Sequence, residues 1–261
     1  MAKGRTGAGK RCVYGVHAVT ALLDKRPAAI VSVKLLRGSS AGKLPKLARA
    51  LEALDVPVER LARADLDRLA QGGAHQGVVV ETKGAAEVGI RELEQLVIDR
   101  GRSFRALILD GVDDPRNLGA CLRTADAAGM DAVIVPRNRA AKLTPVAIKA
   151  ATGAAETVRL VRVANLAATI HWLKDAGVWI VGASAESPRT VYAARLETPI
   201  VLALGGEGRG LRRLTRELCD ELVSIPMQGV VESLNVSVAT GVLLFELGRQ
   251  METGRPRRHD A

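Results

Sequence analysis

Short, nearly uninterrupted apolar runs recur through the second half of the chain and restrict the folds open to it. The first two are RALILD, which starts at Arg105, and AVIVP, which starts at Ala132. A strand that is apolar on both faces has to be covered on both faces, which is typical of parallel sheets with helices on either side. The further runs are TVRLVRV, VWIVGAS, IVLALG and ELVSIP. We therefore expect an α/β domain with a mostly parallel sheet from about residue 105 onward.

Segments with helical patterns separate these runs. NLGACLRTADAAG follows the first run and ends in glycine, and later helices are expected around Ala147, Ile170 and Leu214. A last helix is expected over 236–247, where apolar residues recur at helical spacing. Polar residues precede that helix, and capping of its free N–H groups is the simplest role for them.

Residues 12–83 read as a smaller unit of their own. KLPKLARALEAL has the pattern of an amphipathic helix, and GVVVETK closes the unit with a strand. The alternation of strands and helices predicts a small α/β sandwich. Residues 84–104 are expected to hold a linker of small residues and a lead-in helix.

The charge balance points to a polyanionic partner. The formal net charge is +10, and an excess of this size most often indicates nucleic acid. Basic tails are expected at 1–11 and 251–261, where any phosphate contacts would be non-specific. Aromatic residues make up only 2% of the chain, which argues against a single-strand binder that stacks bases on aromatic side chains.

Other classes are disfavoured by missing patterns. No apolar stretch is long enough to span a bilayer, and the basic start of the chain lacks the apolar core of a signal peptide, so we expect a cytoplasmic protein. The three cysteines and four histidines lack metal-ligand spacing, so no metal is expected. GRTGAGKR near the start resembles a P-loop, but Arg11 stands where that motif has its hydroxyl and no strand precedes it.

Three loops that follow predicted strands carry unusual polar residues. The loop and helix at 110–129 contain Asn117 and Arg123, and the glycine-rich segment 202–213 contains Glu207. The third loop, at 227–231, follows the strand that ends at Ile225 and Pro226 and leads to the last helix. That segment is not a dinucleotide fingerprint, because Leu211 stands where the third glycine is needed. Ligands bind beyond the carboxyl ends of strands in open parallel sheets, so these loops are candidates for a site.

Ordinary structural roles stay open for each of these residues. Asn117 is also suited to capping a helix, and Arg123 to being a surface charge. Glu207 fits a solvated surface turn as well as a site. Ser233 and Asn235 stand at the head of the last helix, where one cap would need only one of them.

Taken together, the three loops resemble the three motifs of the SpoU (TrmH) family in the SPOUT superfamily of RNA ribose 2′-O-methyltransferases. The motifs are DDPRNLGACLRTADAAG, LALGGEGRGL and IPMQGVVESLNVSVATGVLLFE. Their order and spacing match the family over residues 105–250. Residues 12–83, with YGVHAV and HQGVVVE, resemble the L30e-like RNA-binding domain that is joined to many of these enzymes, in a layout similar to enzymes that modify a guanosine of 23S rRNA.

The resemblance implies a C-terminal trefoil knot, which strand patterns do not reveal, and a homodimer. It implies that S-adenosylmethionine (SAM) is held largely by main-chain groups, and a polypeptide that comes so close would explain the glycines of the second motif. The implied cofactor positions are Gly205, Gly206, Ile225, Met227 and Leu234. The implied catalytic positions are Asn117, Arg123, Glu207, Ser233 and Asn235.

By the resemblance, Arg123 would take the role of the base, but a guanidinium is effectively always protonated in proteins and is a poor base. We expect Arg123 to clamp a phosphate and stabilise a developing alkoxide, with Glu207 holding Arg123 or accepting the proton. Three alternatives stay open: a tRNA or another rRNA site as substrate, an inactive RNA-binding protein, and a nucleotide-dependent oxidoreductase. The misplaced glycines weigh against the last.

Overall fold

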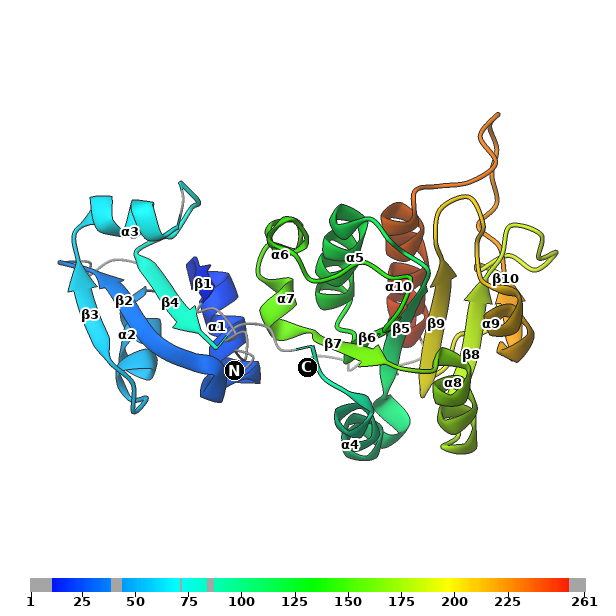
Figure 1. The fold of residues 1–261 in the computed structure, drawn as a ribbon, viewed down its shortest axis with the longest axis horizontal. Helices are drawn as coiled ribbons and strands as arrows, with labels where there is room; N and C mark the ends of the chain where they lie inside the picture. The colour runs from blue at the N-terminus through cyan, green and yellow to red at the C-terminus, as the bar shows by residue number, and fades with distance from the viewer. Residues whose placement is uncertain (1–10, 39–43, 71, 84–86, 254–261) are drawn as a thin grey trace, which may run out of the picture. The chain divides into compact units, whose positions relative to one another are not determined.

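The structure is a computed structural model that describes residues 11–38, 44–70, 72–83 and 87–253. The chain divides into two compact units, residues 1–86 and 87–261 (Figure 1). Most of the two basic tails, and residues 84–86 of the expected linker, lie outside the described residues.

The first unit packs helices on both faces of a small mixed sheet. Its strands run in the order β1-β4-β2-β3, with β4 antiparallel to β1 and β2, and β2 parallel to β3. The elements are β1 (Arg11–Tyr14), α1 (Val16–Lys25), η1 (Pro27–Ala29), β2 (Ile30–Leu36), α2 (Leu44–Glu52), β3 (Val58–Leu61), α3 (Arg63–Leu69) and β4 (Val78–Thr82).

Two apolar clusters form the core of this unit. Leu44, Leu47 and Leu51 recur at helical spacing on α2 and are buried against the sheet in one cluster. Leu66 of α3 is buried in the other, with Val79 of β4. Successive residues of a strand point to opposite faces, so Val78 and Val80 join the first cluster while Val79 joins the second.

The second unit is built on a parallel sheet, as the apolar runs predict. Its strand order is β10-β8-β9-β5-β6-β7, and neighbouring strands in this order are parallel. The elements are α4 (Ile90–Arg100), η2 (Gly101–Ser103), β5 (Arg105–Asp110), α5 (Pro115–Ala127), β6 (Ala132–Pro136), α6 (Pro145–Ala151), α7 (Ala154–Thr157), β7 (Arg159–Val163), α8 (Leu166–Asp175), β8 (Trp179–Ala183), β9 (Ile200–Gly205), α9 (Arg213–Leu218), β10 (Glu221–Val223) and α10 (Val236–Thr253).

Helices cover both faces of this sheet (Figure 1). On one face, Ile108 and Ile134 pack with Leu93 of α4 and Ile170 of α8. On the other, α5 and α10 contact each other and the strands β6 and β9. The expected α/β fold with a mostly parallel sheet is therefore confirmed. The pattern missed only the short helix α7 and the last turns of α10, which continues to Thr253.

The parallel register brings the ends of central strands to one edge. Asp110, the last residue of β5, pairs with Gly205, the last residue of β9. On the other side of β5, Ile108 pairs with Ile134 of β6. The segments that follow β5, β6 and β9 therefore leave the sheet side by side, and this edge is where an open parallel sheet binds ligands.

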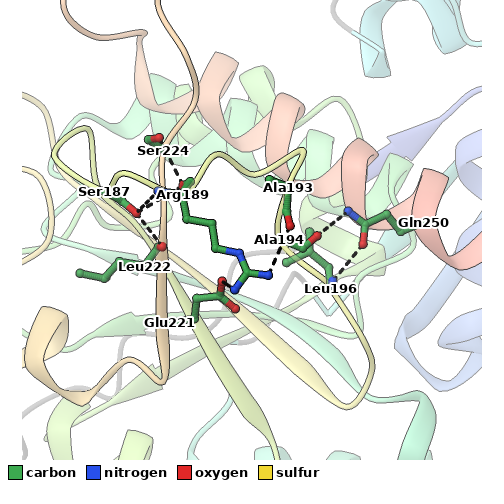
Figure 2. A network of polar contacts seen from close by, with 9 residues as sticks. All are labelled: Ser187, Arg189, Ala193, Ala194, Leu196, Glu221, Leu222, Ser224 and Gln250. Atoms are coloured by element: carbon green, nitrogen blue, oxygen red, sulfur yellow. Dashed lines mark hydrogen bonds and ion pairs between the residues drawn. The ribbon is translucent and has the colours of Figure 1, made fainter.

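The loop of residues 184–199 is hydrogen-bonded to two parts of the C-terminal region (Figure 2). At one side, Ser224 N donates to Arg189 O, and Val191 N donates to Ser224 O, both at 2.8 Å. At the other, the amide of Gln250 on α10 donates to Ala194 O at 3.1 Å. The end of β10 and the last turns of α10 are thus both fastened to one loop, an arrangement suited to a knotted C-terminal segment.

The free cysteines differ in accessibility. Cys121 on α5 is fully buried, and burial raises the pKa of its thiol to about 11. Burial and the neighbouring Asp220 raise the pKa of Cys219 to about 12. Cys12 is exposed, although partial burial of the thiol and Glu81 raise its pKa as well.

We expect iodoacetamide at about pH 8 to alkylate Cys12 well before Cys121 in the folded protein, because the accessible thiolate is the reactive form. At about pH 9.5 a thiol of pKa about 11 is only about 3% ionised, so Cys121 stays largely unmodified there too. Mass spectrometry of the labelled peptides measures this order. Equal rates for Cys12 and Cys121 in the folded protein would contradict the burial, and equal rates in denaturant serve as the control.

Candidate active site

Side chains from three distant segments meet at the carboxyl edge of the second unit. The Asn117 amide donates to Glu207 Oε1, and the Asn235 amide lies 3.2 Å from the same oxygen. Asn235 also donates to Asn117 Oδ1 at 3.2 Å. Each of these residues comes from a different loop region that the sequence marked as a candidate. The structure therefore brings Asn117, Glu207 and Asn235 into one polar cluster.

The start of α5 explains how Asn117 is available for this cluster. The cap of α5 is Asp114, whose carboxylate accepts from Arg116 N at 2.8 Å. Proline follows at the first helical position, where its missing N–H costs nothing. The ordinary capping role considered for Asn117 is therefore wrong, because Asp114 fills it. The Asn117 amide is left to bind Glu207.

Asn235 combines two roles at the start of α10. Its side-chain Oδ1 accepts from Ser237 N at 2.8 Å, which satisfies one of the free N–H groups of the helix. The same oxygen accepts from the Ser237 hydroxyl at 2.6 Å. The cap fixes the amide orientation so that its nitrogen faces Glu207 and Asn117. Ser237 was not singled out by the sequence, and its position two residues after an asparagine cap is the signal for it.

The glycines around Glu207 serve the packing of the loop itself. A Cβ on Gly205 would lie 1.8 Å from the carbonyl carbon of Gly210, and one on Gly206 would lie 2.1 Å from Gly111 O. Gly208 has a φ of +77°, which disfavours other residues. Packing within the chain is therefore enough by itself to require glycine at these first two positions. They let the loop fold back on itself and on the segment after β5.

A buried ion pair that sequence reasoning missed anchors this loop. Asp110 is 1% exposed, and its Oδ2 accepts from Arg212 N at 3.1 Å. The Arg212 guanidinium lies 3.3 Å from Asp110 Oδ1 and donates to Arg139 O at 3.1 Å. A carboxylate in such a place is tolerated only when it is paired. An acid that ends an apolar strand, as in RALILD, is the sequence signal for this anchor.

Two of the predicted catalytic residues make no hydrogen bond to the cluster within the described chain. Arg123 is exposed on α5, six residues after Asn117, which puts it about 120° away around the helix axis. Ser233 is exposed in the loop before α10, and no hydrogen bond of its side chain is found within the described residues. The expected capping role thus belongs to Asn235 and not to Ser233.

The loop between β10 and α10 offers its main chain to a ligand. Across the described chain, no hydrogen bond is found for any residue from Ile225 to Leu234. Ile225, Met227 and Leu234 are half-buried, whereas Val230 is fully exposed. Backbone N–H and C=O groups are obligatory hydrogen-bonding groups. A segment with this many unused groups beside a polar cluster is suited to holding a small polar molecule.

The chemistry available at this edge is that of one carboxylate, neutral amides and main-chain groups. The amides of Asn117 and Asn235 hold the Glu207 carboxylate in one orientation. Within the described ranges, no group of three or more metal-ligating side chains is placed to hold an ion, and no helix is long and apolar enough to cross a membrane.

Comparison with known protein families decides the affiliation. The SpoU rRNA Methylase family matches residues 105–245, which contain the whole polar cluster. The chain belongs to the SpoU family. A second family, described as RNA 2′-O ribose methyltransferase substrate binding, matches residues 12–88. The SpoU resemblance drawn from the three motifs is therefore confirmed.

SpoU relatives align with nearly the whole chain. The 23S rRNA (guanosine-2′-O-)-methyltransferase RlmB of Escherichia coli (strain K12) is 48% identical over 238 residues, covering 91% of this chain and 98% of that protein. The protein of the same name from Haemophilus influenzae is 48% identical over 239 residues, covering 91% and 97%.

Solved SpoU structures share the fold. The SpoU methyltransferase AviRb from Streptomyces viridochromogenes in complex with AdoMet has a TM-score of 0.71 at 26% identity, covering 96% of this chain and 94% of that chain. The A. aeolicus TrmH/SpoU tRNA modifying enzyme has a TM-score of 0.54 at 28% identity, covering 63% and 84%. The α/β fold thus belongs to the class of SPOUT methyltransferases, as expected.

The cluster makes a prediction about Asn235→Asp. An aspartate still accepts from Ser237 N and so keeps the cap, but it faces the Glu207 carboxylate with a like charge. We expect a loss of about 1 kcal/mol of unfolding free energy at neutral pH. Like charge raises the pKa of the new carboxyl above its unfolded value. The loss of unfolding free energy relative to wild type therefore becomes smaller as pH falls through about 4, and it has its full size at higher pH.

Asn165→Asp is the matched control, because Asn165 caps α8 by accepting from Ala168 N and has no hydrogen bond to a carboxylate. Its unfolding free energy should be unchanged or slightly higher than wild type at neutral pH. Urea unfolding at several pH values measures both variants. Equal behaviour of the two variants would show that the cluster does not form.

Proposed function

We propose that this protein transfers the methyl group of SAM to the ribose 2′-hydroxyl of a guanosine in 23S rRNA. The observation that carries this is the similarity to 23S rRNA (guanosine-2′-O-)-methyltransferases, at 48% identity over 91% of the chain. Both units take part in that similarity, since the two matched families cover residues 12–88 and 105–245. By contrast, the tRNA modifying relative matches 63% of the chain.

The residues at the sheet edge fit SAM. The loop from Ile225 to Leu234 has main-chain groups with no partner in the described chain, and they can bind an adenosine and an amino-acid moiety. Ile225, Met227 and Leu234 provide partly buried apolar surface for the adenine. Gly205 and Gly206 complete the proposed binding set at the end of β9. When bound, SAM supplies an electrophilic methyl group on a sulfonium.

The residues of this chain have to prepare the acceptor. A ribose hydroxyl is a poor nucleophile until its proton leaves, so the site needs a proton acceptor and correct alignment. We assign proton acceptance to Glu207, whose carboxylate is oriented by the amides of Asn117 and Asn235. Ser233, in the exposed loop, is assigned to holding the nucleotide.

Arg123 is assigned to charge stabilisation. Its side chain is exposed and has no ion pair or hydrogen bond in the described chain, so it is available to a phosphate or to the developing alkoxide. It is not assigned as the base, because arginine keeps its proton in proteins. Since Arg123 and Asn117 point about 120° apart on α5, a single copy of the chain does not aim Arg123 at Glu207.

We therefore include a homodimer in the proposal. Val238 and Phe245 are about half exposed and lie seven residues apart on one stripe of α10. Thr124 of α5 lies against Gly241 on this helix, so the exposed side chains of α5 and α10 are neighbours. An apolar stripe beside Arg123 is suited to an isologous contact between two copies. Since the proposed substrate is ribosomal RNA, we place the enzyme in the cytoplasm.

The direct test is methyl transfer from labelled SAM to 23S rRNA transcripts and, in parallel, to bulk tRNA, with the modified nucleotide mapped. We expect label on one guanosine ribose of the rRNA. Label on tRNA alone would keep the chemistry and overturn the substrate. SAM binding without transfer to rRNA, tRNA or ribosomal precursor particles would favour the inactive RNA-binding protein.

Arg123→Ala should lower the transfer rate by about 100-fold or more, because a cation that stabilises developing charge is lost. The dissociation constant for SAM should stay at its wild-type value. Arg102→Ala is the control, since Arg102 is exposed in η2 before the amino end of β5. An unchanged rate in Arg123→Ala would remove Arg123 from the catalytic set.

Phe245→Glu should dissociate the dimer, because it places a charge in an apolar contact. Ile98→Glu is the matched control, since Ile98 is 72% exposed on α4, which covers the other face of the sheet. Sedimentation velocity measures the oligomeric state of both variants. A monomeric wild-type protein, or a dimeric Phe245→Glu, would contradict this interface.

A further inference from the structure

A basic loop lies beside the polar cluster and has no part in it. Residues 137–142, RNRAAK, follow β6 directly, and β6 pairs with β5, the strand that precedes Asn117. The loop therefore leaves the same carboxyl edge of the sheet. We call residues 137–142 the basic loop. It contains Arg137, Arg139 and Lys142, and all three are exposed.

The main chain of the basic loop is fixed by two arginines from other elements. Arg162 of β7 donates to Pro136 O at 3.2 Å and to Ala141 O at 2.8 Å. Arg212 donates to Arg139 O at 3.1 Å while it pairs with Asp110. The loop is thus connected through Arg212 to the same buried carboxylate that anchors the loop around Glu207.

Further contacts hold both ends of the basic loop. Arg137 N donates to Val163 O at 2.7 Å, and Ala141 N donates to Val112 O at 2.8 Å. Ala141 is 5% exposed, so the loop is also packed inward at this point. Arg162 is itself held by Glu87 through two contacts of 2.8 Å. The backbone of the loop is consequently well determined, although its side chains face solvent.

The basic side chains of the loop have no acid to neutralise them. In the described chain, no ion pair or side-chain hydrogen bond is found for Arg137, Arg139 or Lys142. The sequence from Ala132 to Ala155 contains no aspartate or glutamate. Other exposed arginines of this unit do have acidic partners: Arg213 pairs with Glu217, and Arg195 with Glu197. An unpaired group of cations on a fixed backbone is suited to a polyanion.

We propose that the basic loop binds the phosphate backbone of the substrate RNA next to the reacting ribose, with Arg137, Arg139 and Lys142 as the phosphate contacts. This inference rests on the proposed function. Arg162 is a positioning residue, because it fixes the loop through main-chain carbonyls while Glu87 takes up its remaining donors. Contacts of this kind set the register of the RNA on the enzyme and carry no base specificity.

The proposal is tested with the triple variant Arg137→Gln, Arg139→Gln and Lys142→Gln in the full-length chain. Binding of a 23S rRNA transcript is measured as a function of salt. Each lost phosphate contact lowers the slope of log affinity against log salt by about 0.7 to 0.9, so the triple variant should lose about 2 to 3. We expect RNA affinity to fall by about tenfold or more at about 0.1 M salt. The SAM dissociation constant should not change.

The matched control is Arg91→Gln with Arg102→Gln. Both arginines are exposed on α4 and η2, before the amino end of β5, and neither has an ion pair in the described chain. The control should keep the wild-type salt slope within about half a unit, because its charges lie away from the carboxyl edge. If the slope of log affinity against log salt fell as much in the control as in the triple variant, the effect would depend only on net charge. That result would overturn the proposal.

The positioning role is tested with Arg162→Lys, which keeps the charge but cannot span Glu87, Pro136 O and Ala141 O at once. We expect a higher KM for RNA with kcat and the SAM dissociation constant unchanged. A structural role alone would instead lower kcat and SAM affinity together. That outcome would remove Arg162 from the proposal.

The outcomes separate this inference from the proposed function. If the wild-type protein neither binds nor methylates RNA, the proposed function fails and this inference fails with it. If the wild type is active and the triple variant matches it in salt slope and affinity, only the basic loop is overturned. A changed SAM dissociation constant in a folded triple variant would assign the loop to the cofactor and also overturn it. If the triple variant does not fold, the three single variants are judged by the same slopes.

Discussion

The buried carboxylate of Asp110 is the interaction on which the edge of the sheet depends. It lies at the end of a central strand, 1% exposed, in a place where an unpaired charge would be strongly destabilising. Arg212 resolves this by donating from its backbone and by placing its guanidinium alongside. The same guanidinium reaches Arg139 O, so one ion pair fixes segments that follow β5, β6 and β9.

The polar cluster follows from this anchor. With the loop after β9 held at Gly206 and Arg212, Glu207 is the residue that projects toward Asn117 and Asn235. The glycines make that geometry possible, because side chains at Gly205 and Gly206 would collide with neighbouring main chain. Helix capping and chemistry are then combined in Asn235, whose oxygen serves α10 while its nitrogen serves the carboxylate.

The two sides of the proposed reaction draw on different physics. The proposed cofactor site would use main-chain groups of the segment from Ile225 to Leu234, for which no hydrogen bond is found in the described chain. The proposed RNA site would use charge, which the basic loop places at the same edge of the sheet on a backbone held by Arg162 and Arg212. A neutral, adaptable loop is suited to a small molecule, whereas fixed cations are suited to a long polyanion.

The sequence by itself determined the parallel α/β architecture, because apolar runs such as RALILD have to be buried on both faces. It also marked Asn117, Glu207 and Asn235 as candidates through their motifs. Only the tertiary structure decided that these three touch and that Asp114, not Asn117, caps α5. It also decided that Ser233 and Arg123 have no hydrogen bond to the three in the described chain. It also gave the glycines their packing role and disclosed the Asp110–Arg212 anchor. The physical reason is that periodicity reports burial and local structure, whereas contacts between residues about a hundred positions apart depend on strand order and register.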